Sequence, residues 1–433
     1  MESKDWIIKV NNELESMADI TTEEVHWKKL SIYRVPASVI DLNKKAYKPQ
    51  TVSVGPYHYG EEHLKAMEEH KHRALLHFLK RSRKPIERYV DALAEVVDDL
   101  KEAYDQLHPV WQQDTEAFLK LMILDGCFIL EILHTATETL DDYAPNDPIF
   151  GNHGRLYVVP YLKRDMLMLE NQLPLLVLEK LVAVEKEKTR GEEKYVTNLI
   201  LEFFSQKGTV KNMEKCLHLL DVYRKSLLQE PRQKRHKKKS GNVVHPGGDE
   251  IIRSATELNE AGIRIKKSNT RSLKDISFHG GVLNLPLIVV DDATESMYLN
   301  LIAFERLHVG AGNEVTSYIF FMDNIMDSAR DVSLLRSCGI IQNAIGSDKA
   351  VANLFNSLSK DVTIDPNSSL DEVHKNVSEY CKKPWNAWRV DIMHNYFRNP
   401  WAILSVIAAI FLLFALTIIQ TVYSILSYVH PSS

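Results

Sequence analysis

The stretch that decides the architecture is Trp401–Val429, which reads WAILSVIAAIFLLFALTIIQTVYSILSYV. The whole of Asn399–Ser433 contains no Asp, Glu, Lys or Arg. An α-helix needs about 20 apolar residues to cross a hydrocarbon core of about 30 Å. A helix in a soluble core rarely stays apolar on every face for so long. We therefore predict a transmembrane anchor at residues 399–429, followed by a short tail at 430–433.

The charges beside this stretch predict its orientation. Residues 382–398 carry four basic side chains and one acidic side chain, and no formal charge follows the anchor. Because basic residues stay on the cytoplasmic side of a membrane helix, we expect residues 1–398 in the cytosol and an anchor inserted after translation. The predicted membrane interface consists of aromatic and basic residues suited to the headgroup region, namely Trp385, Trp388, Arg398 and Trp401.

Two N-glycosylation sequons leave that orientation open. They are Asn367-Ser-Ser and Asn376-Val-Ser. A lumenal body would use them, whereas in a cytosolic body they are chance matches. The N-terminus has no continuous apolar run and does not read as a signal peptide.

Composition excludes several classes of function. Hydrophobic residues make up 45% and charged residues 26% of the chain, as in ordinary globular proteins. The net charge of −5 argues against a nucleic-acid partner. The four cysteines are far apart and form no C-x-x-C motif. That usage is typical of free thiols in a reducing compartment rather than of a disulfide framework or a zinc site.

Histidines between residues 58 and 77 come nearest to a metal site. His63, His70 and His77 share one face of a predicted helix, but a seven-residue spacing is about 10 Å of rise and too long for one ion. No P-loop, zinc-protease, hydrolase-elbow or kinase motif occurs. We predict no metal, no cofactor and no catalytic residue.

Apolar residues three and four apart predict a mainly α-helical body. Such stripes run through residues 86–104 and 118–133. Ser254–Glu257 reads as a capping box, with Gly262 placed to end the short helix that follows. Later helices are expected at 294–308, 314–328, 349–358 and 384–397.

Strand signals are few and short. Thr51–Val54 and Ile32–Val35 are candidate strands that end at prolines or glycines. Residues 275–278 and 282–290 read as a hairpin, with Pro286 placing the second strand at an edge. No βαβ alternation is evident, so the β element is expected to be small.

These signals divide the chain into a leader, a body and an anchor. Residues 1–30 are predicted to form an amphipathic leader helix, and residues 31–398 one mostly helical domain. A basic segment near 229–250 lacks apolar periodicity and reads as a flexible solvated loop. Alternatively, it is a nuclear localisation signal or contacts anionic headgroups. The predicted fold class is mainly α: a single large helical body with a small β-hairpin element and a C-terminal transmembrane helix.

Polar residues inside apolar runs are the candidates for a site. Asp125 falls on the apolar stripe 118–133, and the triplet Glu170-Asn171-Gln172 interrupts a long apolar run. Buried groups of this kind must be hydrogen-bonded, paired or protonated. They either tie helices together or belong to a functional site.

Several phrases occur in an order that resembles a known family. They are Ile32-Tyr-Arg-Val-Pro36, Val52-Ser-Val-Gly-Pro-Tyr-His58, Met67-Glu-Glu-His-Lys71, Asp125-Gly-Cys-Phe-Ile-Leu-Glu131, Leu169-Glu-Asn-Gln-Leu-Pro174, Ser254-Ala-Thr-Glu-Leu258, Asn300-Leu-Ile-Ala-Phe-Glu305, Phe321-Met-Asp323, Gly339-Ile-Ile341 and Asn399-Pro-Trp401. Together they resemble the plant family of domain of unknown function 247, also called uncharacterised protein family 0481. Two departures are local: Tyr59 stands where His is common, and His72 where Trp is usual.

The resemblance implies a land-plant protein with one mostly helical domain and a C-terminal membrane helix. It implies no established catalytic activity and assigns no roles to the motif residues. Some grass members look like male determinants of self-incompatibility, and others have been associated with defence or development.

The functional hypothesis is a non-catalytic, membrane-tethered platform for protein partners. Its expected contacts are membrane lipid and unidentified proteins. Self-association is also open, because Ser405-x-x-x-Ala409 could assist helix pairing. The alternatives are a membrane-anchored hydrolase or transferase that uses buried carboxylates, and a purely structural tether. We further hypothesise one buried polar network, made of Asp125, Glu170, Asn171, Gln172, Glu305 and Asp323.

Overall fold

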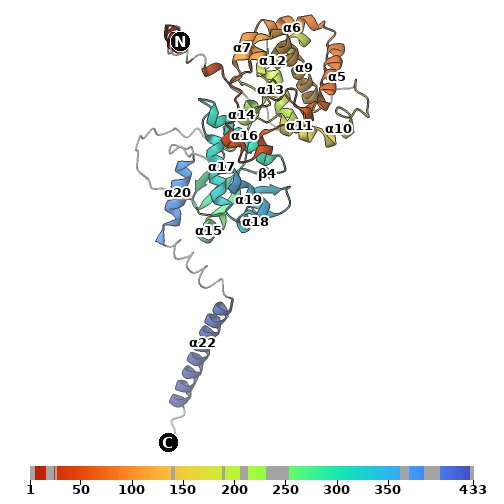
Figure 1. Ribbon diagram of the computed structural model, residues 1–433. Helices are drawn as coiled ribbons and strands as arrows, with labels where there is room; N and C mark the ends of the chain where they lie inside the picture. Colours follow the sequence, from red (N-terminus) through yellow and green to blue (C-terminus); the bar gives the residue numbers. More distant parts are fainter. Residues whose placement is uncertain are drawn as a thin grey trace.

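The computed structural model describes residues 5–15, 24, 27–137, 142–187, 191–204, 213–230, 253–360, 370–384 and 400–429. Helices dominate these residues, as the apolar spacing predicts, and the strands are few and short. Figure 1 shows two groups of helices, with α14 and α16 labelled where the groups meet and α22 standing apart. The N-terminal α1 (Asp5–Glu15) has its large apolar side chains exposed.

The first group of helices packs around α9, which is almost wholly buried. Asp114 caps it by accepting a hydrogen bond from the Ala117 amide at 2.9 Å. A Cβ on Gly126 would lie 2.5 Å from a methyl of Leu181, so this glycine lets α12 approach α9 closely. The group comprises η1 (Glu62–Leu64), α5 (Ala66–Ser82), α6 (Ile86–Ala94), α7 (Val97–Glu102), α8 (Pro109–Gln113), α9 (Thr115–His134), α10 (Asn152–Tyr157), α11 (Val159–Asp165), α12 (Leu175–Lys186) and α13 (Glu192–Phe203).

The second group surrounds two small sheets. Its helices are α15 (Ala255–Glu260), α17 (Glu314–Ile325), α18 (Ala329–Ser337), α19 (Asp348–Leu358) and α20 (Asp371–Cys381). The three-stranded sheet has the order β1–β3–β2, and the second sheet pairs β4 with β5. The strands are β1 (Arg264–Lys267), β2 (Ser277–His279), β3 (Val282–Leu285), β4 (Ile288–Val290) and β5 (Ile341–Asn343).

The expected hairpin is confirmed, but its surroundings are not as predicted. Strands β2 and β3 pair antiparallel around Gly280 and Gly281, both at positive φ. The predicted strand 282–290 is divided at Pro286: β3 ends before it, and β4 joins the other sheet. Strand β3 is central rather than an edge, and two strand pairs are parallel. The sequence did not predict these parallel pairs, because the paired strands are not adjacent along the chain.

Two other predicted strands do not form. Thr51–Val54 is extended but belongs to no sheet, and Ile32–Val35 contributes only an isolated bridge from Ile32 to Tyr104. Ser254 does cap α15, accepting from the Glu257 amide. The predicted helices near 294–308, 314–328 and 349–358 are present as α16, α17 and α19.

One continuous apolar core joins the two groups. The buried apolar side chains form a single cluster that extends from Leu30 to Cys381. Four helices lie at the junction: α3 (Ala37–Ile40), α4 (Lys44–Tyr47), α14 (Leu219–Leu227) and α16 (Thr294–Leu307).

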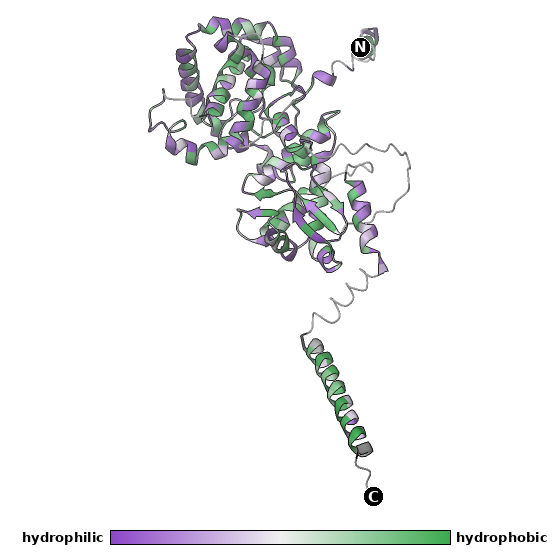
Figure 2. Ribbon diagram, turned by 180° about the vertical axis from the view of Figure 1, so that it is seen from behind, coloured by the Kyte–Doolittle hydropathy of each residue, from purple (hydrophilic) through white to green (hydrophobic). Residues whose placement is uncertain are grey.

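The terminal helix α22 (Pro400–Val429) stands apart from the described part of the body in Figure 1. Its segment Leu404–Leu426 has a mean hydropathy of 2.4 and is not buried. Figure 2 shows it hydrophobic along most of its length, in contrast to the body, where hydrophilic and hydrophobic residues alternate. By length and composition this helix could cross a membrane.

Several expectations near the anchor fall outside the described residues. These are the helix at 384–397, most of the basic loop, the tail 430–433, Asn367, and the interface residues Trp385, Trp388 and Arg398. Trp401 lies in the first turn of α22, and Asn376 is exposed on α20.

Candidate functional site

The polar triplet meets a second non-helical stretch inside the body. Residues 166–174 join α11 to α12, and the segment 50–58, which bends at both ends, runs beside them. Glu170, Asn171 and Gln172 are at most 5% exposed. Neither stretch lies in a sheet. The buried backbone N–H and C=O groups of both stretches therefore depend on side chains for hydrogen bonds.

Asn171 bonds to the extended segment as a neighbouring strand would. Its Oδ1 accepts from the Val54 amide at 2.7 Å, and its Nδ2 donates to the Val52 carbonyl at 3.0 Å. The same Nδ2 donates to the Asp165 carbonyl at 3.0 Å. This amide explains why Thr51–Val54 is extended without belonging to a sheet.

Asp165 completes that arrangement, and sequence analysis missed it. Its Oδ2 accepts from the amides of Gln50 at 2.9 Å, Thr51 at 2.6 Å and Val52 at 3.1 Å. Burial raises the pKa of Asp165, and the three amide donors oppose that rise. The carboxylate is a structural acceptor for the segment.

Gln172 ties the turn to α14. Its Nε2 donates to the carbonyls of Met166 at 2.7 Å and Met168 at 2.8 Å. Its Oε1 accepts from the Leu220 amide at 3.0 Å, in the first turn of α14. The Tyr104 hydroxyl donates to the Gln172 carbonyl at 3.1 Å. One side chain therefore satisfies backbone groups at two helix ends.

Gly55 lies where the two stretches come closest. It has a φ of 75°, and an added Cβ would stand 2.7 Å from the Gln172 carbonyl oxygen. Its amide donates to Asp125 Oδ2 at 2.8 Å. Glycine is required here for both the conformation and the close approach.

Asp125 also forms a fully buried ion pair. Lys71 Nζ lies 2.7 Å from Asp125 Oδ1, 2.7 Å from Glu68 Oε1 and 3.1 Å from Ser53 Oγ. Lys71 and Asp125 are both 0% exposed. Burial raises the pKa of Asp125, which the Lys71 ammonium opposes. Burial alone would lower the pKa of Lys71, but the two neighbouring carboxylates raise it.

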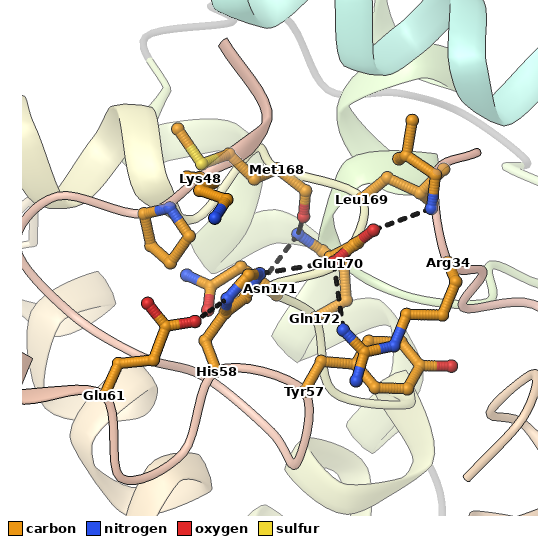
Figure 3. A network of polar contacts seen from close by, with 12 residues as sticks. Arg34, Lys48, Tyr57, His58, Glu61, Met168, Leu169, Glu170, Asn171 and Gln172 are labelled. Carbon is orange, nitrogen blue, oxygen red and sulfur yellow. Dashed lines mark hydrogen bonds and ion pairs between the residues drawn. The ribbon is translucent and has the colours of Figure 1, made fainter. Parts of the chain in front are cut away.

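Glu170 lies between backbone and cationic groups (Figure 3). Its Oε1 accepts from the Val35 amide at 2.7 Å. Its Oε2 lies 3.3 Å from Arg34 Nη1 and 3.4 Å from His58 Nε2. Burial favours the neutral acid, but the bonds from His58 and Val35 and the charge of Arg34 lower the pKa of Glu170.

His58 links that carboxylate to the surface. Its Nδ1 is 2.7 Å from Oε1 of Glu61, whose side chain is 36% exposed. This carboxylate–histidine–carboxylate series runs from the buried Glu170 to the partly exposed Glu61. Among the described residues, no serine or cysteine is hydrogen-bonded to His58, so the series lacks the nucleophile of an acyl-transfer site.

Glu305 belongs to a separate polar cluster. It lies 2.9 Å from Nε and 2.5 Å from Nη2 of Arg224, which projects from α14. Its oxygens accept from the amides of Val315 at 3.0 Å and Thr316 at 2.8 Å, in the first turn of α17. This carboxylate joins three helices and interacts favourably with the amino-terminal end of α17.

Asp323 lies in a third place, half-buried on α17. It lines a shallow polar hollow with Ser254, Glu257 and Asp327. Burial raises the pKa of Asp323. The hypothesis of one six-residue network is therefore corrected. Only Asp125 and the triplet lie at the polar crossing, the place where residues 166–174 meet residues 50–58; within the described residues neither Glu305 nor Asp323 bonds to those four. Sequence order does not say which helices meet.

Further polar residues that sequence analysis did not single out support the crossing. His218 Nε2 donates to the Ser31 carbonyl at 3.0 Å while its Nδ1 caps α14, and burial lowers its pKa to about 4. Asn300 accepts from the Leu169 amide at 2.9 Å. Lys71 and Asn300 lie within the family phrases quoted in the sequence analysis. Each is a polar residue on an apolar helix face, and that pattern could have identified both as candidates. Asp165 and His218 had no such signal.

A metal site is not evident in the described part of the chain, where no group of three or more metal-ligating side chains comes together. The described cysteines are unpaired thiols, and Cys127, Cys216 and Cys381 are buried. Burial raises the pKa of Cys127 and so keeps its thiol protonated. Its surroundings are not those of a reactive thiolate.

Fold and site together define a class of protein: a largely helical body held by buried polar crossings, followed by one long apolar helix. Comparison with known proteins gives the family. The chain belongs to the family of domain of unknown function 247, described as a plant protein of unknown function, whose model matches residues 32–415.

Two relatives from Arabidopsis thaliana support this assignment. A UPF0481 protein is 34% identical over 422 residues, covering 92% of this chain and 87% of the relative. A putative UPF0481 protein is 22% identical over 506 residues, covering 94% of this chain and 92% of the relative. No solved structure matches the chain.

Proposed function

We propose that this chain is a membrane-tethered, non-catalytic platform that binds protein partners. The observation that carries the proposal is the set of hydrogen bonds and ion pairs that the carboxyl groups make at the polar crossing. The carboxyl groups of Asp125, Asp165 and Glu170 accept from backbone amides, and Asp125 and Glu170 also face cationic groups. A carboxylate held in this way serves the fold and is not poised for acid–base chemistry. These contacts support the platform over the alternative of an enzyme that uses buried carboxylates.

An exposed apolar surface on α10 and α11 is the candidate docking face. Leu156, Tyr157 and Tyr161 are 65%, 58% and 59% exposed. Exposed aromatic residues are enriched at protein interfaces. A body held at a surface by α22 would present this face at a raised local concentration to other tethered proteins.

Topology is the first test of the proposal. The full chain, with an N-terminal tag, would be expressed in plant cells, and protease protection of the tag would be measured together with glycan at Asn376. A tethered cytosolic platform predicts a membrane-bound, protease-sensitive and unglycosylated body. A protected and glycosylated body would move the proposed partners to the lumen or cell surface, and an unbound chain would contradict the tether.

The docking face is tested by proximity labelling from the same membrane. We expect neighbours labelled by the wild-type chain to be lost in a Leu156→Ser/Tyr161→Ser variant. They should be retained in a Leu76→Ser variant, which changes another exposed leucine, on α5. An identical set of neighbours for all three chains would contradict the assignment of this face.

A further inference from the structure

A cavity at the junction of the two helix groups lies outside the polar crossing. Its volume is about 160 Å³, and it is bounded by the α3–α4 segment, one face of α16 and the end of α19. Most of its walls are apolar, including Val35, Val39, Leu299, Ile302, Ala303 and Leu307. An apolar cavity of about 150 Å³ is large enough to bind a benzene ring.

The mouth of this cavity is cationic. Arg306 and Lys360 line it and are exposed, and Glu295 is the one acidic residue among the described residues of the lining. Neither Arg306 nor Lys360 has an ion-pair partner within the described residues. An arginine in this state can bind a carboxylate through two parallel hydrogen bonds.

Tyr47 supplies a second, independent indication of a ligand. Tyr47 lines the cavity and is 4% exposed, yet its hydroxyl has no hydrogen-bond partner in the described part of the chain. Burial raises the pKa of Tyr47 to about 12, with opposing effects from Arg306 and Glu295, so the phenol stays a donor at neutral pH. The hydroxyl oxygen itself is not fully buried, so it is free to donate to a ligand that enters the cavity.

We propose that this cavity binds a small carboxylic acid with a single ring-sized apolar body. The ring occupies the apolar walls between α3 and α16. The carboxylate pairs with Arg306 and accepts a hydrogen bond from the Tyr47 hydroxyl, while Lys360 adds positive charge at the mouth.

This ligand goes beyond the proposed platform function and connects to it through Val35. That residue lines the cavity, and its amide donates to Glu170 at the polar crossing. The ligand would therefore stabilise the crossing together with the cavity, because binding to the folded state raises its stability.

Calorimetric titration of the full chain in nanodiscs tests the proposal, with phenylacetate as the probe and empty nanodiscs as the blank. We expect saturable binding with a Kd below about 1 mM, as a ligand of this size allows. The uncharged phenylacetamide should bind about tenfold more weakly, because it lacks the charge-assisted bonds. Acetate, which lacks the ring, should give no saturable heat.

Variants locate the binding. Arg306→Gln should weaken phenylacetate binding about tenfold, and Tyr47→Phe about threefold to fivefold. Ala303→Phe, which fills the cavity, should abolish it. Arg271→Gln is the matched control, because Arg271 is exposed and does not line the cavity; it should leave the Kd unchanged.

Clear outcomes would overturn the assignment. Absence of saturable heat up to about 10 mM phenylacetate excludes such a ligand at the affinity expected for its size. Equal affinity for the acid and the amide, or an unchanged Kd in Arg306→Gln, excludes the proposed anion site. If Ala303→Phe fails to fold, the Arg306→Gln and Tyr47→Phe variants still decide the question, since they introduce no bulk.

Discussion

Two regions of this molecule reverse the usual distribution of side chains, in opposite directions. At the polar crossing, charged and amide groups lie in the interior, and Lys71 and Asp125 are 0% exposed. Along α22, large apolar side chains such as Phe411 and Tyr423 are exposed by 77% and 75%. Each reversal is costly in water unless something compensates it.

The compensation differs between the regions. At the crossing it comes from the protein itself, because the side chains of Lys71, Asn171 and Gln172 pair with groups from other parts of the chain. For α22 the proposed compensation is the bilayer, since the helix satisfies its own backbone bonds and needs no protein partner. Thr417, for example, donates to the Leu413 carbonyl at 2.7 Å within the helix. The first region is specified by tertiary contacts and the second by composition.

The largest effect is expected from placing charge in α22. A Leu413→Lys/Leu416→Lys variant puts two ammonium groups near its middle, at a cost of about 2.5–3.5 kcal/mol each. We expect the chain to move from the carbonate-resistant membrane fraction to the supernatant. The Leu413→Ala/Leu416→Ala control should stay in the membrane. Membrane retention of the lysine variant would break the contrast, because α22 would then not be held by lipid.

Breaking the buried ion pair is the next largest effect. Lys71→Met leaves Asp125 without its cation and should lower the free energy of unfolding by about 3–5 kcal/mol. Urea unfolding of the full chain in nanodiscs, followed by tryptophan fluorescence and circular dichroism, would measure it. The double variant Lys71→Met/Asp125→Asn should regain most of the loss, because the neutral amide still accepts from Gly55.

A matched surface pair sharpens that result. Lys180 lies 3.1 Å from Glu95, and these side chains are 28% and 70% exposed. Lys180→Met should cost less than about 1 kcal/mol, because solvent screens the pair. Equal losses at Lys71 and Lys180 would mean that burial does not distinguish the two pairs.

Acid should lower the free energy of unfolding of the helical body through its buried histidines. Burial lowers the pKa of His134 to about 4, so the unfolded chain binds a proton near pH 6.5 that the folded chain still excludes. The contribution of His134 to the free energy of unfolding is therefore fully present above about pH 6.5. It is lost as the pH falls toward 4, by about 3 kcal/mol. His134→Phe should flatten that part of the pH profile of the unfolding free energy, whereas His279→Phe, on the surface, should not. A slope unchanged by His134→Phe would contradict the assignment.

A loss smaller than that at Lys71 is expected at Asn171. Asn171→Ala removes its bonds to Val54, Val52 and Asp165 and leaves buried backbone groups unpaired, for a loss of about 2–3 kcal/mol. The melting temperature should fall by several degrees. Asn259→Ala, at an exposed position on α15, should change stability by less than about 0.5 kcal/mol. A melting temperature unaltered in Asn171→Ala would show that the amide does not hold the extended segment.

Local sequence patterns predicted a helix or hairpin correctly where its formation depends mainly on its own residues. Helices α16, α17 and α19 and the β2–β3 hairpin follow from apolar spacing and from Gly280-Gly281. Thr51–Val54 has the residues of a strand, but the side chains of Asn171 and Asp165 take the place of a neighbouring strand. The parallel partners β1 and β5 and the grouping of the site carboxylates depend on distant contacts, which no local pattern carries.

The sequence by itself determined the helical class of the body, the long apolar helix at its end and the polar residues that could not be left unpaired. These follow from short-range periodicity and from the cost of burying polar groups, which act residue by residue. Only the tertiary structure decided that Asp125 pairs with Lys71, that Glu170 faces His58 and Arg34, and that Glu305 and Asp323 lie elsewhere. Those partners are joined by chain folding across tens of residues, so their distances come from the packing of helices and not from their order in the chain.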